Sequence, residues 1–219
     1  MAREPKRKRN AAAGPLRQGF GGQGPRALDA PGMARAIRAF LEAADVDLSH
    51  PELAGTPDRV AQAWCEEFLD GYRVDPGALL RESVLVTDND PSASGLVLVK
   101  GIPFHGVCPH HLLPFQGLAH IGYLPDGRLA AFSALVRLLD AFAHRLELQE
   151  TVTRQVAEAL VHHLGVRGAA CVLESEQPCL TLRGVKRRGT RILTSHFAGD
   201  LASRKDLRAD FLRSIGKLD

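Results

Sequence analysis

The sequence predicts an α+β fold in which helices cover one face of an antiparallel sheet. Short apolar runs with strand-like composition recur from residue 83 onward, and residues typical of turns separate them. Two longer segments with helical periodicity lie between these runs. Strands that pair through hairpins, with helices inserted among them, are typical of an α+β domain.

The composition is that of one compact domain with a terminal tail. Of the 219 residues, 45% are hydrophobic and 24% are charged, which suffices for a core and is ordinary for a globular protein. The net charge is +3, and much of the positive excess lies in the first ten residues. A nucleic-acid-binding protein is not expected, because the remainder contains no basic stripe with interleaved aromatic residues.

The protein is expected to be cytoplasmic and to have no membrane partner. No apolar run approaches the about 18 residues that a membrane span needs. The basic N-terminus is not followed by the apolar segment of a secretory signal. Four cysteines are too few for a disulfide scaffold in a chain of this length. Two of them, Cys65 and Cys171, lie in apolar patterns and are predicted to be core residues.

Residues 1–30 are predicted to form a disordered basic tail. Four consecutive basic residues begin at Lys6, and the following stretch is rich in Gly, Ala, Gln and Pro. The alternative is a nucleic-acid or nuclear-import patch. A short charged run without aromatic residues is more often a solvated tail.

Residues 32–72 are predicted to form a helical hairpin. Apolar residues recur at helical spacing in the first helix. The second helix is expected to begin at Thr56 as N-cap, with Pro57 at the first helical position. Gly71 is expected to end it. Two helices joined by a short loop make an antiparallel pair.

The strands predicted in the rest of the chain are 83–86, 96–99, 118–124, 129–131, 169–173, 179–185 and 192–194. Asp126-Gly127 is predicted to be a hairpin turn. Ser133 is predicted to cap one inserted helix, while the other begins at Gln149 and is stopped by Gly165. A last helix is expected near the C-terminus.

The run Cys-Pro-His-His at residues 108–111 indicates a metal site. It offers a thiolate and an imidazole three residues apart, and Cys179 is the candidate third ligand. Zinc binds such ligands tetrahedrally, and three protein ligands leave one position for water, as in catalytic sites. From spacing alone, plain buried cysteines are an equally good interpretation. A zinc deaminase is disfavoured because Leu182 stands where that pattern has its last cysteine.

Four motifs resemble those of GTP cyclohydrolase I and occur in matching order. They lie at residues 108–115, 120–125, 148–153 and 179–185. The resemblance runs from about Met33 to the C-terminus. The order of all four motifs is far more specific than any one of them.

The resemblance implies a tunnelling fold, an antiparallel sheet with two helices on one face. This part would span residues 80–219 of a GTP cyclohydrolase I-like domain at 31–219. In this family, subunits join their sheets edge to edge into rings, and two rings stack into a homodecamer with active sites at subunit interfaces. Closing the sheet edges in this way is sensible, because open edges invite uncontrolled pairing.

The resemblance also implies a reaction. GTP would be hydrolysed at C8 with release of formate, giving 7,8-dihydroneopterin triphosphate in the first step of folate or pterin biosynthesis. Zn²⁺ held by Cys108, His111 and Cys179 would activate water by lowering its pKa towards about 7. His110 would protonate N7 and then shuttle protons.

Glu150 is expected to anchor the purine. A carboxylate can accept two parallel hydrogen bonds from N1–H and the exocyclic amino group of guanine, an arrangement that adenine cannot offer. Gln149 could take a further edge of the base. Both roles rest on the resemblance, because this pair alone is an ordinary helix start.

Four side chains are expected to bind the phosphates: Arg183, Arg137, Ser133 and Arg59. Alternation along a strand would put Cys179 and Arg183 on one face about 13 Å apart, which could span a nucleoside triphosphate. Arg137 follows Ser133 by four residues and lies on the same helix side. The Thr-Pro-x-Arg motif of Arg59 is similar to one that reaches a neighbouring subunit's triphosphate. Taken singly, Arg137 and Arg59 also fit solvated surface charges.

Three positions depart from the family pattern. Pro109 stands where the family usually has glutamate. The proline is expected to stiffen the turn. Gln177 stands where a catalytic histidine is usual, and glutamine cannot carry a proton at neutral pH. Ala134 replaces a phosphate-binding lysine, at a cost of about 1.5–3 kcal/mol of binding. A second hypothesis therefore stays open: a weakly active or inactive zinc-containing paralogue that binds a purine or pterin, or assembles with an active homologue.

Overall fold

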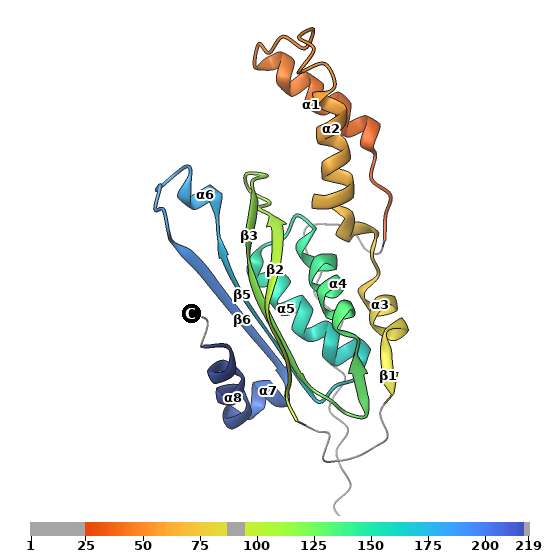
Figure 1. Cartoon of the computed structure of the whole chain (residues 1–219), viewed down its shortest axis with the longest axis vertical. Coiled ribbons are helices and arrows are strands. Elements are labelled where there is room, and N and C mark those ends of the chain that lie inside the picture. The colour runs from red at the N-terminus through yellow and green to blue at the C-terminus, as the bar shows by residue number, and fades with distance from the viewer. Residues whose placement is uncertain (1–24, 87–94, 217–219) are drawn as a thin grey trace, which may run out of the picture.

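The computed structural model of the protein describes residues 25–86 and 95–216 (Figure 1). Most of the tail predicted at 1–30 lies outside these residues. None of the helices within the described ranges combines the length and apolar composition that crossing a bilayer requires.

Four antiparallel strands form the main sheet: β2 (Val97–Val107), β3 (Pro114–Leu124), β5 (Gly168–Glu176) and β6 (Arg191–Gly199). They lie in the order β2-β3-β5-β6, so that β2 and β6 are the two edges. The pairing of β2 with β3 shifts register between Val99 and Ile102. Gly101 lies at this shift with a φ of 72°, a left-handed conformation that favours glycine.

Two helices, α4 (Phe132–Ala143) and α5 (Gln149–Ala159), cover one face of the sheet (Figure 1). Leu135, Leu138 and Leu160 are fully buried and belong to one core cluster with Ile121 and Leu173 of the sheet. α5 continues as a π-helical turn, η4 (Leu160–Leu164), and ends at Gly165 with a φ of 76°, as the sequence predicts. The predicted α+β class, with two helices on one face of an antiparallel sheet, is confirmed.

The opposite face of the sheet is covered by α7 (Asp200–Ser203) and α8 (Lys205–Ile215). Phe211 is fully buried there, in a second cluster with Leu124 and Val172. A Cβ atom at Gly122 would lie only 2.8 Å from the Phe211 ring. Glycine at this position therefore lets the helix pack closely onto the strand.

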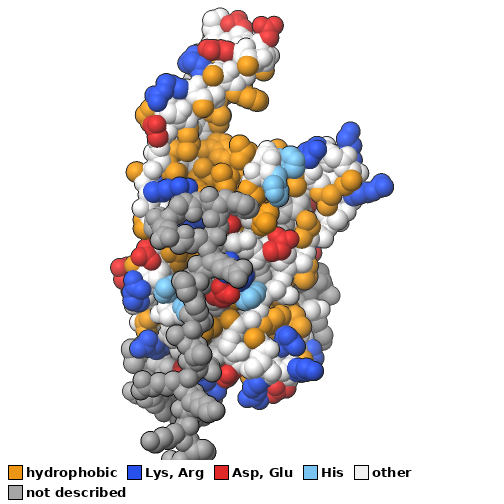
Figure 2. Space-filling view, turned by 180° about the vertical axis from the view of Figure 1, so that it is seen from behind, with side chains coloured by type: hydrophobic (Ala, Val, Ile, Leu, Met, Phe, Trp, Pro, Cys, Tyr) orange, Lys and Arg blue, Asp and Glu red, His pale blue; other side chains and the backbone are white. Residues whose placement is uncertain are grey.

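The N-terminal helices are α1 (Ala30–Ala43) and α2 (Thr56–Ala63), followed by η1 (Trp64–Phe68), η2 (Asp70–Arg73) and α3 (Pro76–Glu82). α1 and α2 project away from the sheet (Figure 1). No residue of α1 is buried, and Phe40 is 68% exposed. Figure 2 shows hydrophobic side chains along this projecting pair. A single chain therefore leaves apolar surface uncovered here.

Three predicted boundaries are wrong. Gly55, not Thr56, precedes α2, and Ala131, not Ser133, precedes α4, in both cases without a side-chain cap. Gly71 lies inside η2 rather than ending a helix. Its physical role is close packing, because a Cβ atom there would meet three backbone carbonyl oxygens of the segment 140–144 within 3.0 Å.

The turn at Asp126-Gly127 does not make the predicted hairpin. β4 (Arg128–Ala130) pairs with β1 (Val84–Val86) in a separate two-stranded sheet, not with β3. The Ala130 amide donates instead to Tyr123 Oη over 3.1 Å. The chain therefore leaves the main sheet at this turn.

The strand predicted at 179–185 is also wrong. Residues Pro178–Thr181 form a single helical turn, α6, followed by irregular chain. Proline at the first helical position has a suitable φ and needs no hydrogen bond there. The Gln177 carbonyl accepts hydrogen bonds from the amides of Leu180 (2.8 Å) and Thr181 (3.0 Å). These bonds close a helical turn where side-chain alternation alone suggested an extended chain.

Candidate metal centre and its surroundings

Cys108, His111 and Cys179 converge in the structure. Their potential ligand atoms all lie within 4.8 Å of one another. Cys108 and His111 come from the turn after β2, and Cys179 comes from α6. Among the described residues, no other group of three or more His, Cys, Asp or Glu side chains meets this test. The sequence placed these three residues together although about seventy positions separate the turn from Cys179.

The turn after β2 is held by its own backbone. The Cys108 amide donates to the Leu113 carbonyl (3.0 Å), and the Leu112 amide donates to the Cys108 carbonyl (2.9 Å). Leu112 has a positive φ of 53°, which is uncommon for a residue other than glycine. This closed turn brings His111 Nδ1 to 3.8 Å from Cys108 Sγ.

The two sulfur atoms have different surroundings. Cys108 is buried, whereas Cys179 is partly exposed. Burial and the adjacent Cys108 thiol raise the pKa of Cys179, and the Arg183 guanidinium acts in the opposite direction. Two thiols and an imidazole are the donors that zinc prefers, and a bound cation would favour their deprotonated forms. The residues present therefore fit a zinc ion.

Arg183 lies beside this group and not at the far end of a strand. Its Nη1 is 2.7 Å from His111 Nε2. The predicted spacing of about 13 Å assumed an extended chain. It does not apply, because the chain turns after α6 and Gly184 adopts a φ of 64°. Arg183 and the candidate metal ligands therefore share one surface.

His110 is exposed and next in sequence to the group. Its ring centroid lies 6.2 Å from that of His111, with the two rings inclined at 72°. It is not a member of the Cys-His-Cys group. His110 therefore lies next to the candidate metal ligands without being one of them, and its role as a proton carrier stays a prediction.

Gln149 and Glu150 begin α5 and differ in orientation. Glu150 is exposed, whereas Gln149 is 4% exposed and its side chain is turned inward. Gln149 Nε2 lies 3.1 Å from three acceptors that share its two hydrogens: the carbonyls of Leu173 and Ile192 and Thr194 Oγ1. The Gln149 amide is therefore hydrogen-bonded inside the protein, whereas the exposed Glu150 carboxylate can reach a ligand.

A buried polar network continues from Gln149. Its Oε1 accepts from Ser175 Oγ (2.6 Å) and from Gln177 Nε2 (3.1 Å). Gln177 Nε2 also donates to Ser175 Oγ over 3.0 Å. Thr153 Oγ1 donates to the Gln149 carbonyl over 2.7 Å. Ser175 and Thr153 are not among the predicted site residues, although Thr153 follows Gln149 by four residues and so lies on the same helix face.

A cavity of about 470 Å³ lies between α5 and the edge strand β6. It is lined by Glu150, Thr151, Thr153, Arg154, Thr194, Ser195 and His196. Arg154 Nη1 contacts Glu158 Oε2 at 2.7 Å, and His196 Nε2 lies 3.6 Å from the other Glu158 oxygen. Burial is the main cause that lowers the pKa of His196. The exposed carboxylate of Glu150 thus borders a cavity of a size suited to a small molecule.

The remaining candidate phosphate-binding residues stay apart from the metal group. Ser133 and Arg137 are exposed on α4. Arg59 is exposed on α2, where its Nη2 donates to the Glu52 carbonyl (3.0 Å) and to Thr56 Oγ1 (2.9 Å). Ala134 is 2% exposed and packs inward. The described chain brings only Arg183 of the predicted phosphate set to the metal group.

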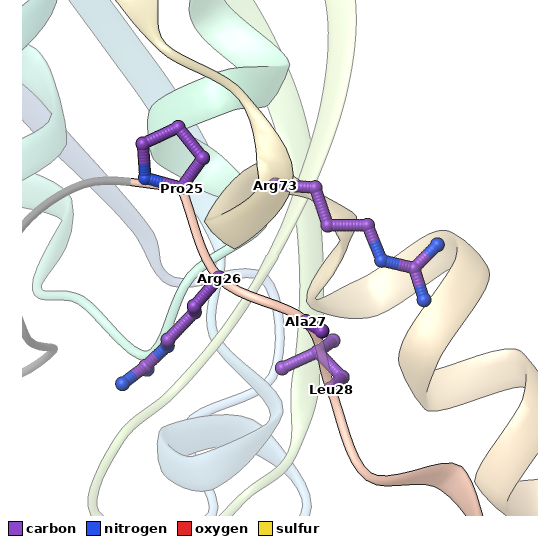
Figure 3. Close-up of a pocket in the computed structure, with 5 residues that line it drawn as sticks. All are labelled: Pro25, Arg26, Ala27, Leu28 and Arg73. Carbon is purple, nitrogen blue, oxygen red and sulfur yellow. The ribbon is translucent and has the colours of Figure 1, made fainter.

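A second cavity, of about 380 Å³, lies between the N-terminal segment and η2 (Figure 3). It is lined by Pro25, Arg26, Ala27, Leu28 and Arg73. Arg26 and Arg73 point in different directions in Figure 3, and the Arg26 guanidinium lies 3.9 Å from the centre of the Tyr72 ring. None of the predicted site residues lines this cavity.

Comparisons with known proteins identify related sequences. The model of the family described as GTP cyclohydrolase I matches residues 33–216. GTP cyclohydrolase 1 of Ralstonia nicotianae is 44% identical over 191 residues, covering 87% of this chain and 88% of that protein. GTP cyclohydrolase 1 of Chromobacterium violaceum is 40% identical over 191 residues, covering 87% and 90%. A solved structure titled archaeosine synthase QueF-Like in the apo form aligns with a TM-score of 0.40 and 17% identity, covering 48% of this chain and 93% of that one.

Proposed function

The chain belongs to the GTP cyclohydrolase I family, and we propose that it is a zinc enzyme that opens GTP at C8, releases formate and yields 7,8-dihydroneopterin triphosphate. The chain is a hydrolase of the GTP cyclohydrolase type. One observation carries the finer proposal: two cysteines and a histidine from distant segments offer ligand atoms within 4.8 Å of one another.

Cys108, His111 and Cys179 would hold the metal in this proposal. Their two sulfurs and one nitrogen suit zinc better than calcium or magnesium, which prefer oxygen ligands. A bound zinc ion supplies Lewis acidity that makes water a nucleophile near neutral pH. Three protein ligands leave a coordination position for that chemistry.

His110 is the proposed proton carrier. It is exposed next to the metal-binding group, and an imidazole can both donate and accept a proton. In the proposal, His110 gives a proton to N7 of the purine and later moves protons during ring opening. Gln177 does not share this task, because an amide does not exchange its protonation state near pH 7.

Glu150 is the proposed purine anchor. Its exposed carboxylate borders the cavity between α5 and β6, and it can accept hydrogen bonds from N1–H and the exocyclic amino group of guanine. The Gln149 amide is engaged inside the protein, which supports a role in holding the start of α5. A direct contact between Gln149 and the base stays a prediction.

Arg183, Arg137, Ser133 and Arg59 are the proposed phosphate ligands. Arg183 is adjacent to His111, and the other three are exposed on α4 and α2. We propose a homo-oligomer, a decamer as in the family, in which Arg59 serves a neighbouring subunit's site. The exposed apolar side chains of the projecting helices support an assembly, because isolated monomers rarely leave such surface open.

The extent of the functional unit is also part of the proposal. Residues 31–219 would form one GTP cyclohydrolase I-like domain, with a helical hairpin at 32–72 and a tunnelling-fold part at 80–219. The family match over residues 33–216 supports the extent of this domain. A cytoplasmic location fits an enzyme whose proposed metal ligands include reduced cysteines.

The test is direct. The purified full-length protein is incubated with GTP, and formate and, after oxidation, neopterin fluorescence are measured together with the zinc content. We expect one zinc per chain, both products, and loss of turnover when a chelator removes the metal. Stoichiometric zinc without either product would refute the enzyme and favour the weakly active or inactive paralogue.

A further inference from the structure

Gln177 connects the two halves of the proposed site. Its main-chain carbonyl closes the helical turn that carries Cys179, by accepting from the amides of Leu180 and Thr181. Its side chain reaches the other way and donates to Gln149 Oε1 and Ser175 Oγ. Gln149 immediately precedes Glu150 at the start of α5. One buried residue thus contacts both the helical turn of Cys179, which we call the metal-binding turn, and the helix that carries the base anchor.

The directions of the hydrogen bonds in this network are determined. The Ser175 hydroxyl has a single hydrogen, which goes to Gln149 Oε1 at 2.6 Å because that amide oxygen can only accept. Ser175 Oγ can therefore only accept from Gln177, and Gln149 Oε1 also only accepts. Both contacts of Gln177 Nε2 need a hydrogen from Gln177. The two acceptors lie only 2.6 Å apart, and the Gln177 amide donates to both from one side.

We propose that Gln177 is a positioning residue that fixes the metal-binding turn against the start of α5 and so sets the spacing between Cys179 and Glu150. This inference rests on the proposed function for the roles of those two residues. The network requires a hydrogen-bond donor from residue 177, which a carboxylate would not provide.

This requirement changes what a histidine at position 177 is expected to do. It would introduce a titrating group, and because its ring nitrogens occupy other positions than the glutamine amide, it would disturb the hydrogen bonds to Gln149 and Ser175. A buried polar group that loses its partner is costly, and Gln177 is only 7% exposed. Gln177→His is therefore expected to loosen the metal-binding turn rather than to improve the enzyme.

The experiment compares Gln177→Met and Gln177→Glu with the wild-type protein in three measurements. Zinc affinity is measured by competition with a chromophoric chelator, and the Co²⁺-substituted protein gives the ligand-field spectrum. GTP binding to the metal-free protein is measured by calorimetry. Both variants are expected to bind zinc about ten- to a hundredfold more weakly, as when other outer-shell partners are lost, with a shifted Co²⁺ spectrum. GTP is expected to bind more weakly to both.

Gln155→Met is the matched control. Gln155 is also a buried glutamine on α5, 4% exposed, and its Oε1 has no hydrogen-bond partner among the described residues. It does not take part in the network around Gln149. The control is expected to keep wild-type zinc affinity and the wild-type Co²⁺ spectrum. If Gln177→Met does not fold, Ser175→Ala replaces it, since this variant removes one acceptor of Gln177 and is expected to weaken zinc binding in the same way.

The outcomes separate this inference from the proposed function. Zinc affinity and Co²⁺ spectra unchanged in the folded Gln177 variants, or altered equally in Gln155→Met, would overturn the positioning role. The double variant Gln149→Met/Gln177→Met is expected to lose little more zinc affinity than Gln177→Met alone, because both act through one contact. If the losses of zinc affinity in the two single variants add up in the double variant, Gln149 and Gln177 do not act through one contact. Failure of the wild-type protein to convert GTP would refute the proposed reaction, while the zinc measurements would still decide the role of Gln177.

Discussion

The candidate metal ligands and the candidate phosphate ligands are assembled in different ways. Cys108, His111 and Cys179 meet within 4.8 Å, and hydrogen-bonded turns hold the segments that carry them. Arg59 and Arg137 are exposed on two separate helices, and Arg59 bonds only to its own hairpin. One chain therefore brings the metal half of the proposed site together, whereas the phosphate half would need another surface. The proposed active site between subunits would account for this difference.

The largest effect is expected from loss of a sulfur ligand. Cys179→Ala should reduce zinc from one ion per chain to nearly none and abolish GTP turnover, because two ligands hold zinc poorly. Metal analysis and formate release measure both quantities. Cys171→Ala, at a fully buried cysteine of β5, is the control and should retain zinc. A Cys179→Ala protein that still holds one zinc per chain would contradict the proposal that these three side chains of one chain hold the metal.

Loss of the base anchor should have the next largest effect. Glu150→Gln removes two charge-assisted hydrogen bonds worth about 1.5–3 kcal/mol each, so kcat/KM for GTP should fall about 10²- to 10⁴-fold. Zinc content should not change. Inosine triphosphate lacks the exocyclic amino group, so the wild-type enzyme should discriminate against it and the variant should do so much less. Unchanged discrimination would assign base recognition to another residue.

Substitutions of the candidate phosphate ligands are expected to have a smaller effect, mainly on KM for GTP. Arg59→Ala should raise KM for GTP about ten- to a hundredfold, since one charged contact contributes about 1.5–3 kcal/mol. If Arg59 serves a neighbouring site, subunits of Arg59→Ala mixed and reassembled with Cys179→Ala should regain activity. Some sites would then combine an intact metal group with an intact arginine. No recovery in verified mixed oligomers would mean that both residues serve the site of their own chain.

The smallest effect concerns the sheet beneath the site. His120 is 2% exposed, and its Nδ1 accepts a hydrogen bond from the Gly101 amide over 3.2 Å. Burial lowers its pKa from the ordinary value. As the pH falls below about 6.5, the unfolded chain therefore binds a proton that the folded chain does not, and stability is lost at up to about 1.4 kcal/mol per pH unit.

His120→Asn should reduce this slope, because asparagine offers an acceptor but does not titrate. Urea unfolding between pH 7.5 and 5.5, a range chosen around the ordinary histidine pKa of about 6.5, measures the slope. Burial also lowers the pKa of His163 and His196, so part of the slope should remain. Zinc content at pH 7 should be unchanged. An equally steep slope in the variant would exclude His120 as its source.

The sequence predicted which three side chains come together as candidate metal ligands, but it did not predict the secondary structure of the segment that carries Cys179. Cys108 and His111 are three residues apart in one turn, so their proximity is a local property. The helical turn that presents Cys179 was predicted as a strand, because Cys-Leu-Thr-Leu-Arg alternates like a strand while Pro178 starts a helix. Four residues are too few for periodicity to distinguish the two.

The polar network could not have been predicted in the same way. Gln149 bonds to Leu173, Ser175, Gln177 and Thr194, which lie 24 to 45 residues away in the sequence. Only the fold brings these partners together. The inward orientation of Gln149 and the engagement of Gln177 follow from the pairing of β5 with β6 beneath α5, and no local pattern records that pairing.

The close fit of Phe211 against Gly122 has a consequence for shortened forms of this chain. A protein that ended before Leu207 would lose the aromatic ring and uncover Leu124, Ala170 and Val172 on the back of the sheet. Such a truncated form would present a continuous apolar strip to solvent and would be expected to aggregate. The last described helix, α8, therefore covers an apolar face of the sheet and protects it from aggregation, even though it carries none of the proposed catalytic side chains.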